Sequence, residues 1–181
     1  LAMTNNWLAV GAPNEASCTD GVNPPLAEMG QEDCVGSGAV FLYKKTDNSW
    51  TYHSWLKPPK IDFEVPYFFG ASLVFAEDDA GIVSLAVGAP HPETDNQGNV
   101  VGGGGQGDVY FYAFDGKNQK GWQYLAPLSE SEDPTVQAFF LAGGGYALVG
   151  WSLAGNQDRL AIGALYFNDG LHEIGLVLVS G

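Results

Sequence analysis

Basic side chains are scarce in this sequence, and their scarcity argues against two classes of partner. The 181 residues include 7 Lys and Arg against 21 Asp and Glu, which gives a formal net charge of −14. Nucleic acids and anionic membrane surfaces are bound through basic patches. The sequence therefore predicts no nucleic-acid partner, whereas its charge favours solubility and leaves room for cations.

Cysteine is also rare, with only Cys18 and Cys34, both inside the acidic segment 14–37. A disulfide between them is the favoured interpretation, and it would indicate an oxidising, extracellular location. The alternative is two free thiols in a reducing cell. No histidine stands nearby, so a metal site built on these two cysteines is not expected. No signal peptide is visible, which fits a processed mature chain or a fragment.

Long uncharged stretches are almost absent, and residues 136–155 are the exception. Their length is enough to span a bilayer. However, the end of this stretch belongs to a repeat, and three glycines at 143–145 interrupt it. The sequence therefore predicts no membrane span.

One short motif occurs three times and organises the whole chain. Its copies are Leu-Ala-Val-Gly-Ala-Pro at 8–13, the same six residues at 85–90, and Leu-Ala-Ile-Gly-Ala at 160–164. The copies begin 77 and 75 residues apart. Self-similarity at a fixed long period is the signature of a repeat protein. Each copy predicts a short strand that ends at Gly-Ala-Pro, since proline cannot donate to a strand ladder.

Three further elements accompany the motif. Phe-Gly or Val-Gly segments precede it at 69–73 and 149–153, and glycine-led strands follow it at 38–43, 107–112 and 175–179. Tryptophan-led strands come last, at 50–56 and 122–125. Each repeat therefore predicts four short strands, which is the composition of one propeller blade.

The pattern FG-x-S, then L-A-V-G-A-P, then G-x-V-x-x-[YF] resembles the FG-GAP repeat of integrin α-chain propellers and related bacterial and fungal proteins. The second repeat matches best, with Phe69-Gly70 and Gly88-Ala89-Pro90, whereas the third has Val149 and Leu165 in place of Phe and Pro. The resemblance implies an all-β chain of two and a half to three four-stranded β-propeller blades. It implies a single region over 1–181, with repeats at approximately 1–68, 69–147 and 148–181, that neighbouring chains could complete.

The resemblance also implies where calcium would bind, because the loop between the first and second strands often carries a calcium site in this family. Here that loop holds Glu77, Asp78 and Asp79 without the alternating D-x-D-x-D-G pattern, so a solvated acidic turn is the preferred interpretation. Asp95, Asn96 and Asn99, with Asp108 beyond them, form a second weak candidate. No other cofactor is expected.

No residue pattern indicates catalysis. Gly70-Ala71-Ser72 and Gly150-Trp151-Ser152 lack the second glycine of a nucleophile elbow and the strand-turn-helix context that an elbow requires. The histidines His53, His91 and His172 share no ligand spacing. We therefore expect that the chain is not an enzyme.

The last expected strand, Gly175-Leu176-Val177-Leu178-Val179, carries no charge. An uncharged apolar edge can template pairing with another chain. The sequence therefore predicts an extracellular module that mediates adhesion or assembles with itself, into a ring or, as we favour, a helical filament. Two alternatives remain: a lectin-like propeller whose aromatic residues bind a glycan, and an accessory domain of a larger secreted enzyme. A protein ligand is a further candidate partner.

Overall fold

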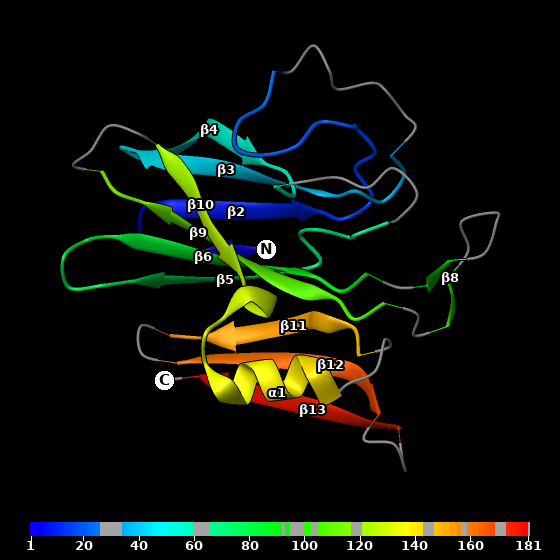
Figure 1. Cartoon of the computed structure of the whole chain (residues 1–181). Coiled ribbons are helices and arrows are strands. Elements are labelled where there is room, and N and C mark those ends of the chain that lie inside the picture. The colour runs from blue at the N-terminus through cyan, green and yellow to red at the C-terminus, as the bar shows by residue number, and fades with distance from the viewer. Residues whose placement is uncertain are drawn as a thin grey trace.

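β-Strands form three antiparallel sheets that lie one above another in Figure 1. The computed structural model describes residues 1–25, 34–59, 66–91, 93–94, 100–102, 105–116, 121–142, 147–156, 159–168 and 173–180. The chain is all-β, as the sequence predicts, and the described residues add one short helix and one 3-10 turn. These residues form an open stack of sheets with no closed barrel or ring.

Each sheet is a meander in which neighbouring strands are antiparallel. Sheet 1 contains β1 (Ala2–Met3), β2 (Trp7–Ala12), β3 (Ala39–Thr46) and β4 (Ser49–Leu56). Sheet 2 contains β5 (Ser72–Glu77), β6 (Val83–Ala89), β9 (Asp108–Phe114) and β10 (Trp122–Pro127). Sheet 3 contains β11 (Val149–Gly155), β12 (Leu160–Asn168) and β13 (Glu173–Ser180). A small hairpin of β7 (Glu93–Thr94) and β8 (Val100–Gly102) projects beside sheet 2.

The strand registers repeat from sheet to sheet. The motif alanines Ala9, Ala86 and Ala161 pair with Ala2, Val74 and Ala154 of the preceding strands. The motif glycines pair in the same way with Val40, Val109 and Val177 of the following strands. Because partners in a register share one face of the sheet, equivalent residues occupy equivalent faces in all three sheets.

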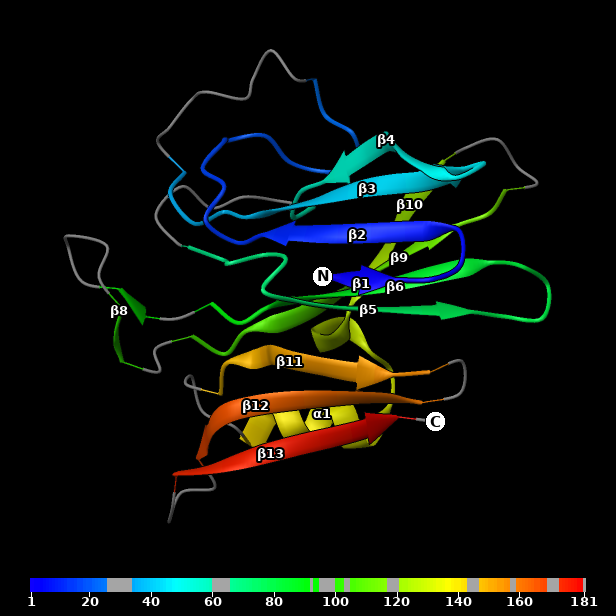
Figure 2. The same ribbon diagram turned by 180° about the vertical axis from the view of Figure 1, so that it is seen from behind.

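The loops between the second and third strands gather at one end of the stack. Figure 2 shows the described parts of these loops on the side of β8, and the β5–β6 hairpin at the opposite end. This arrangement follows from antiparallel pairing, which places alternate connections at alternate ends of a sheet.

One short helix was not expected from the repeats. α1 (Pro134–Ala142) follows the 3-10 turn η2 (Leu128–Glu130). The side chain of Asp133 begins the helix, because its Oδ1 accepts hydrogen bonds from the backbone N–H groups of Thr135 (2.7 Å) and Val136 (3.4 Å). No described helix is long and apolar enough to cross a membrane.

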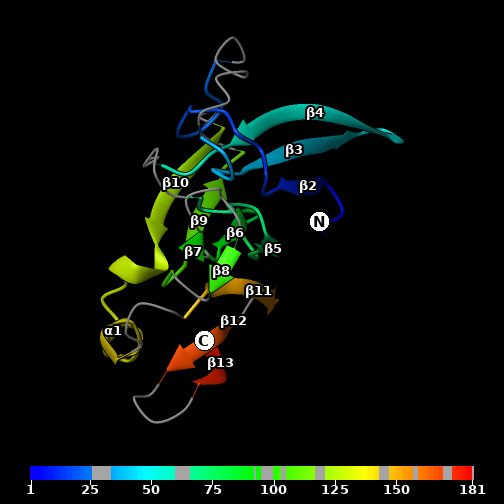
Figure 3. The same cartoon turned by 90° about the vertical axis from the view of Figure 1, so that its right-hand side faces the viewer.

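Two apolar cores lie between the sheets, which Figure 3 shows nearly edge-on. The first core joins sheets 1 and 2 and includes Trp7, Leu42, Leu85, Tyr112 and Trp122. The second joins sheets 2 and 3, and Leu128 of η2 and Val136 of α1 complete it. Each pair of neighbouring sheets therefore has a buried interface of its own.

Repeated glycines allow the sheets to approach closely. A Cβ atom on Gly11 would lie 2.0 Å from the carbonyl oxygen of Gly70, and one on Gly88 would lie 2.1 Å from that of Gly150. Real Cβ contacts are never this short, so any side chain here would force the sheets apart. The glycines of the recurring motif are therefore required where one sheet meets the next.

Candidate interaction surfaces

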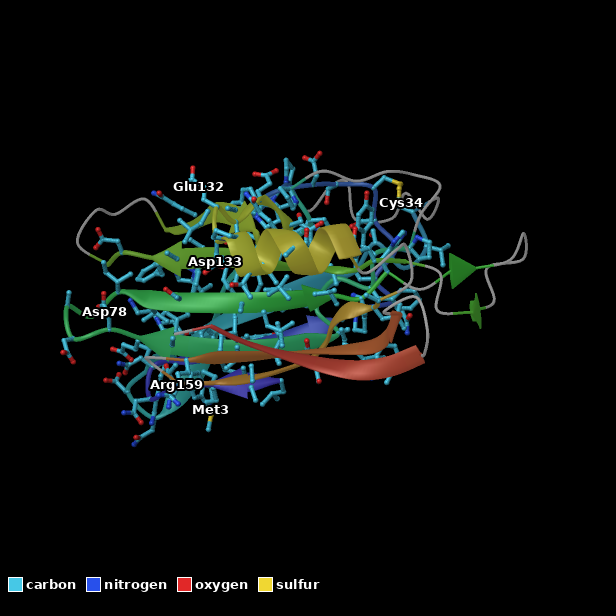
Figure 4. The ribbon with its side chains drawn as sticks, turned by 60° about the horizontal axis from the view of Figure 1, so that its bottom comes forward. Met3, Cys34, Asp78, Glu132, Asp133 and Arg159 are labelled. Carbon is cyan, nitrogen blue, oxygen red and sulfur yellow. A yellow bond between two sulfur atoms is a disulfide. The ribbon has the colours of Figure 1, made fainter. Side chains whose placement is uncertain are left out.

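The disulfide predicted from the sequence is present and fixes the loop between β2 and β3. Cys18 and Cys34 are bonded, with their Cα atoms 5.2 Å apart, and Cys34 is buried. Figure 4 shows Cys34 and the disulfide at the opposite end of the sheets from Asp78. The bond holds the loop against the end of sheet 1, where the Trp55 side chain donates to the carbonyl oxygen of Pro24 at 3.0 Å.

A buried lysine anchors the same loop, and sequence reasoning missed it. The Lys57 side chain is fully buried, donates to the Glu15 carboxylate and donates to Ser37 Oγ at 2.7 Å. Ser37 Oγ in turn donates to the carbonyl oxygens of Glu15 and Ser17. No repeat marks Lys57, so only its place directly before Pro58-Pro59 sets it apart in the sequence.

The electrostatics of this pair follow from its burial. Burial lowers the pKa of Lys57, and the nearby Glu15 carboxylate offsets part of that effect. Burial alone would raise the pKa of Glu15, but hydrogen bonds from Lys57 and Ser17 lower it below its ordinary value. The two side chains are hydrogen-bonded to each other inside the fold, so we assign the pair a structural role.

Those acidic calcium candidates that the structure describes are not grouped into a metal site. Asp78 Oδ1 accepts hydrogen bonds from the backbone N–H groups of Ala80 (2.9 Å) and Ile82 (2.8 Å), so it stabilises its own turn beside Glu77 and Asp79. Among the residues that the structure describes, no three His, Cys, Asp or Glu side chains are grouped to hold a metal ion. Asp95, Asn96 and Asn99 lie outside the described residues.

Asp108 serves a different purpose from the one considered in the sequence. Its carboxylate accepts hydrogen bonds from the backbone N–H groups of Val109 (2.7 Å) and Ser129 (3.2 Å), and from the Ser129 hydroxyl. Burial raises the pKa of Asp108 although these hydrogen bonds lower it in part. The carboxylate thus ties the start of β9 to η2.

Ser72, His53 and His91 make contacts in different parts of the structure. Ser72 Oγ donates to the carbonyl oxygen of Gly150 at 2.7 Å, which joins sheet 2 to sheet 3. The His53 ring packs against Trp7 and Phe114, and the His91 ring lies 5.7 Å from the Tyr67 ring. His172 lies outside the described residues.

An open pocket of about 530 Å³ lies on the outer side of sheet 1. It combines one tryptophan with polar side chains of the β1–β2 turn and the β3–β4 hairpin. Its lining residues are Met3, Thr4, Asn5, Asn6, Lys45, Asp47 and Trp50. Trp50 is 36% exposed, so its ring is available to a ligand.

β13 is one of the two edge strands of sheet 3, and β11 is the other. Sheets 1 and 2 each have four strands, but β13 pairs with β12 alone among the described residues. The edge includes 175–179, the uncharged segment that the sequence predicted to self-associate. Its backbone is therefore placed to accept one more strand.

Comparisons of the sequence with models of protein families and with curated proteins found no match.

Proposed function

We propose that this chain is an extracellular structural module, built of FG-GAP-type propeller blades, that assembles with itself. The observation that carries the proposal is the outer edge of β13, which has no partner strand among the described residues, whereas the other two large sheets each have a fourth strand. A strand edge without a partner is a template for pairing with another molecule. The recurring four-strand meander and its repeated registers support the assignment of each sheet as a blade.

The disulfide supports the extracellular part of the proposal. Bonds of this kind form and persist in oxidising compartments and are rare in the cytosol. In addition, the excess of acidic residues keeps separate copies dispersed until a specific contact forms.

Sedimentation velocity over a range of protein concentrations tests the self-assembly. We expect the sedimentation coefficient to rise with concentration, because contacts between copies obey mass action. Hydrogen exchange read in the same series should show slower exchange in 173–180 if β13 gains a partner strand. A single species of monomer size at every concentration up to the millimolar range contradicts the proposal.

The pocket on sheet 1 favours glycan binding as a second candidate function. Amphipathic rings such as Trp50 present apolar area next to polar groups, and the pocket adds the side chains of Asn5, Asn6 and Asp47. Binding to a glycan array, lost in Trp50→Ala and kept in Trp151→Ala, would support this function. Trp151 is 50% exposed but lies outside the pocket, which makes it the matched control. An array on which the native chain binds no glycan would remove this candidate.

A further inference from the structure

The two internal interfaces of the stack are built from the same two halves. Each sheet has two faces: one carries the alanine and glycine of the recurring motif, and the other carries its leucine and its valine or isoleucine. At both interfaces, the alanine–glycine face of one sheet packs against the leucine face of the following sheet. Thus Ala9 of sheet 1 packs with Leu85 and Val87 of sheet 2, and Ala86 of sheet 2 packs with Ile162 of sheet 3. The order of the halves is the same both times.

Each kind of face also occurs once more on the outside of the stack: the leucine face on sheet 1 and the alanine–glycine face on sheet 3. We propose that the outer face of sheet 3 binds the outer face of sheet 1 of a second copy, so that copies stack head to tail. This inference rests on the proposed self-assembly and assigns the contact to a sheet face; pairing through the β13 edge is the alternative route, which the test below distinguishes.

Val83 and Phe114 in or against the core of sheet 2 have the polar counterparts Asn6 and Lys45 in sheet 1, but the outer face of sheet 1 retains large side chains at six other positions that sheet 2 buries. In sheet 2 these are Leu73, Phe75, Leu85, Val87, Tyr112 and Trp122, all in the core with sheet 1. By strand register their counterparts in sheet 1 are Leu1, Met3, Leu8, Val10, Tyr43 and Trp50. Trp122 is 3% exposed and Phe75 is 8% exposed, whereas Trp50 and Met3 are 36% and 64% exposed.

Several large apolar side chains on this face are exposed. An antiparallel sheet with one wet face normally alternates apolar and polar residues. Here Leu1 is 81% exposed and Tyr52, the counterpart of Tyr124, is 48% exposed. Exposed apolar side chains gathered on one face mark a candidate interaction site. In sheet 2 the equivalent face packs against the inner face of sheet 1. The outer face of sheet 1 should therefore fit a partner that resembles that inner face.

The outer face of sheet 3 carries small residues at two positions that match the inner face of sheet 1. Ala154 and Ala161 pair across β11 and β12 as Ala2 and Ala9 pair across β1 and β2. Ala9 is fully buried by sheet 2, whereas Ala154 is exposed and Ala161 is half-buried. Small residues at these positions leave room for the large side chains of a following sheet.

A second copy is the occupant that supplies the complementary face, because every chain carries both halves. The contact is heterologous, so it repeats and generates a ring or a filament.

Two charge variants on exposed residues test the proposal without touching the cores. Ala154→Arg places a cation on the outer face of sheet 3, and Met3→Glu places an anion on the outer face of sheet 1. Both residues are exposed, so each variant should fold. Leu125→Glu is the matched control, because Leu125 is 58% exposed at the β10 bulge and lies on neither outer face.

We expect each of the two variants to sediment as a monomer, and Leu125→Glu to assemble like the native chain. An equimolar mixture of Ala154→Arg and Met3→Glu should assemble, since the two unaltered faces fit each other and the cation of one variant meets the anion of the other. The double variant should assemble again. If native chain and both single variants assemble alike, the face contact is wrong and self-assembly through the β13 edge stands. If the native chain is a monomer at every concentration, both proposals fall.

Discussion

Lys57 shows how a single buried charge can determine the position of a long loop. Its side chain is fully buried, and Glu15, its partner, is 16% exposed. Desolvating an ion pair is costly, so such a pair contributes little net stability by itself. Removing one member, however, leaves the other charge without a partner. The pair therefore determines the position of the loop, because any other loop position would leave a buried charge without its partner.

We expect Lys57→Met to lower the free energy of unfolding by about 3 kcal/mol, the low end for a broken buried pair, because Glu15 keeps some access to water. Lys57→Met combined with Glu15→Met should recover part of that loss, since no charge is then left unpaired. Urea denaturation of the two single variants and the double variant measures the coupling. Strictly additive losses would show that the two side chains do not interact.

His53 gives a pH-dependent reporter of the interface between sheets 1 and 2. Its ring lies 4.9 Å from the Trp7 ring, and burial, followed by the positive charge of Lys44, lowers its pKa below the ordinary 6.5. The folded chain thus binds this proton less tightly than the unfolded chain. The contribution of His53 to stability is complete above the unfolded pKa and declines as the pH falls through 6.5 towards the lower pKa of the folded chain.

An NMR titration of His53 should therefore give a midpoint below 6.5 in the folded protein. His53→Gln should remove this part of the decline in stability on acidification, while the carboxylates continue to titrate at lower pH. A midpoint at or above 6.5 would mean that the ring is not enclosed by the two sheets.

At the scale of the elements, the close approach of strands at the motif glycines decides how the sheets stack. Gly88→Ala directs a methyl group at the Gly150 carbonyl oxygen and at Ser72 Oγ. We expect Gly88→Ala with Ser72→Ala to lower the free energy of unfolding by roughly 3 kcal/mol, the upper end for overpacking, because a backbone carbonyl cannot rotate away. Urea denaturation measures the loss.

The matched control is the same pair of changes in sheet 3, Gly163→Ala with Ser152→Ala. A Cβ atom on Gly163 would meet Ser152 Oγ at 2.2 Å but no carbonyl of a following sheet at a comparable distance. We expect a much smaller loss in this control, measured at a concentration where the chain is dissociated. Equal losses in the two sheets would show that the sheet contact is not the cause.

The strands and their registers could be predicted from the sequence because they recur. The gapless match of 1–9 with 153–161 predicts that Ala2 and Ala154 hold equivalent places, and their pairing with Ala9 and Ala161 confirms it. α1 could have been found from Asp133-Pro134, an N-cap residue followed by the proline that favours the first helical position. Lys57 could not be found, because burial of a charge depends on a partner 42 residues away.

At the scale of the whole molecule, the proposed contact joins the outer face of sheet 3 in one copy to the outer face of sheet 1 in the next. Copies carry a net charge of −14 and repel one another, so the apolar contact must overcome that repulsion. Salt screens charge but leaves apolar burial in place. Assembly should therefore strengthen with ionic strength, in contrast to an assembly held by salt bridges.

Native mass spectrometry at micromolar concentration tests the central claim, that the stack of sheets continues from one copy to the next, most directly. The chain has a mass of 19.2 kDa. Head-to-tail stacking predicts masses at successive multiples of that value: a single closed multiple for a ring, or an open series for a filament. A spectrum that contains only the 19.2 kDa monomer at the highest accessible concentration and at high salt would contradict the account.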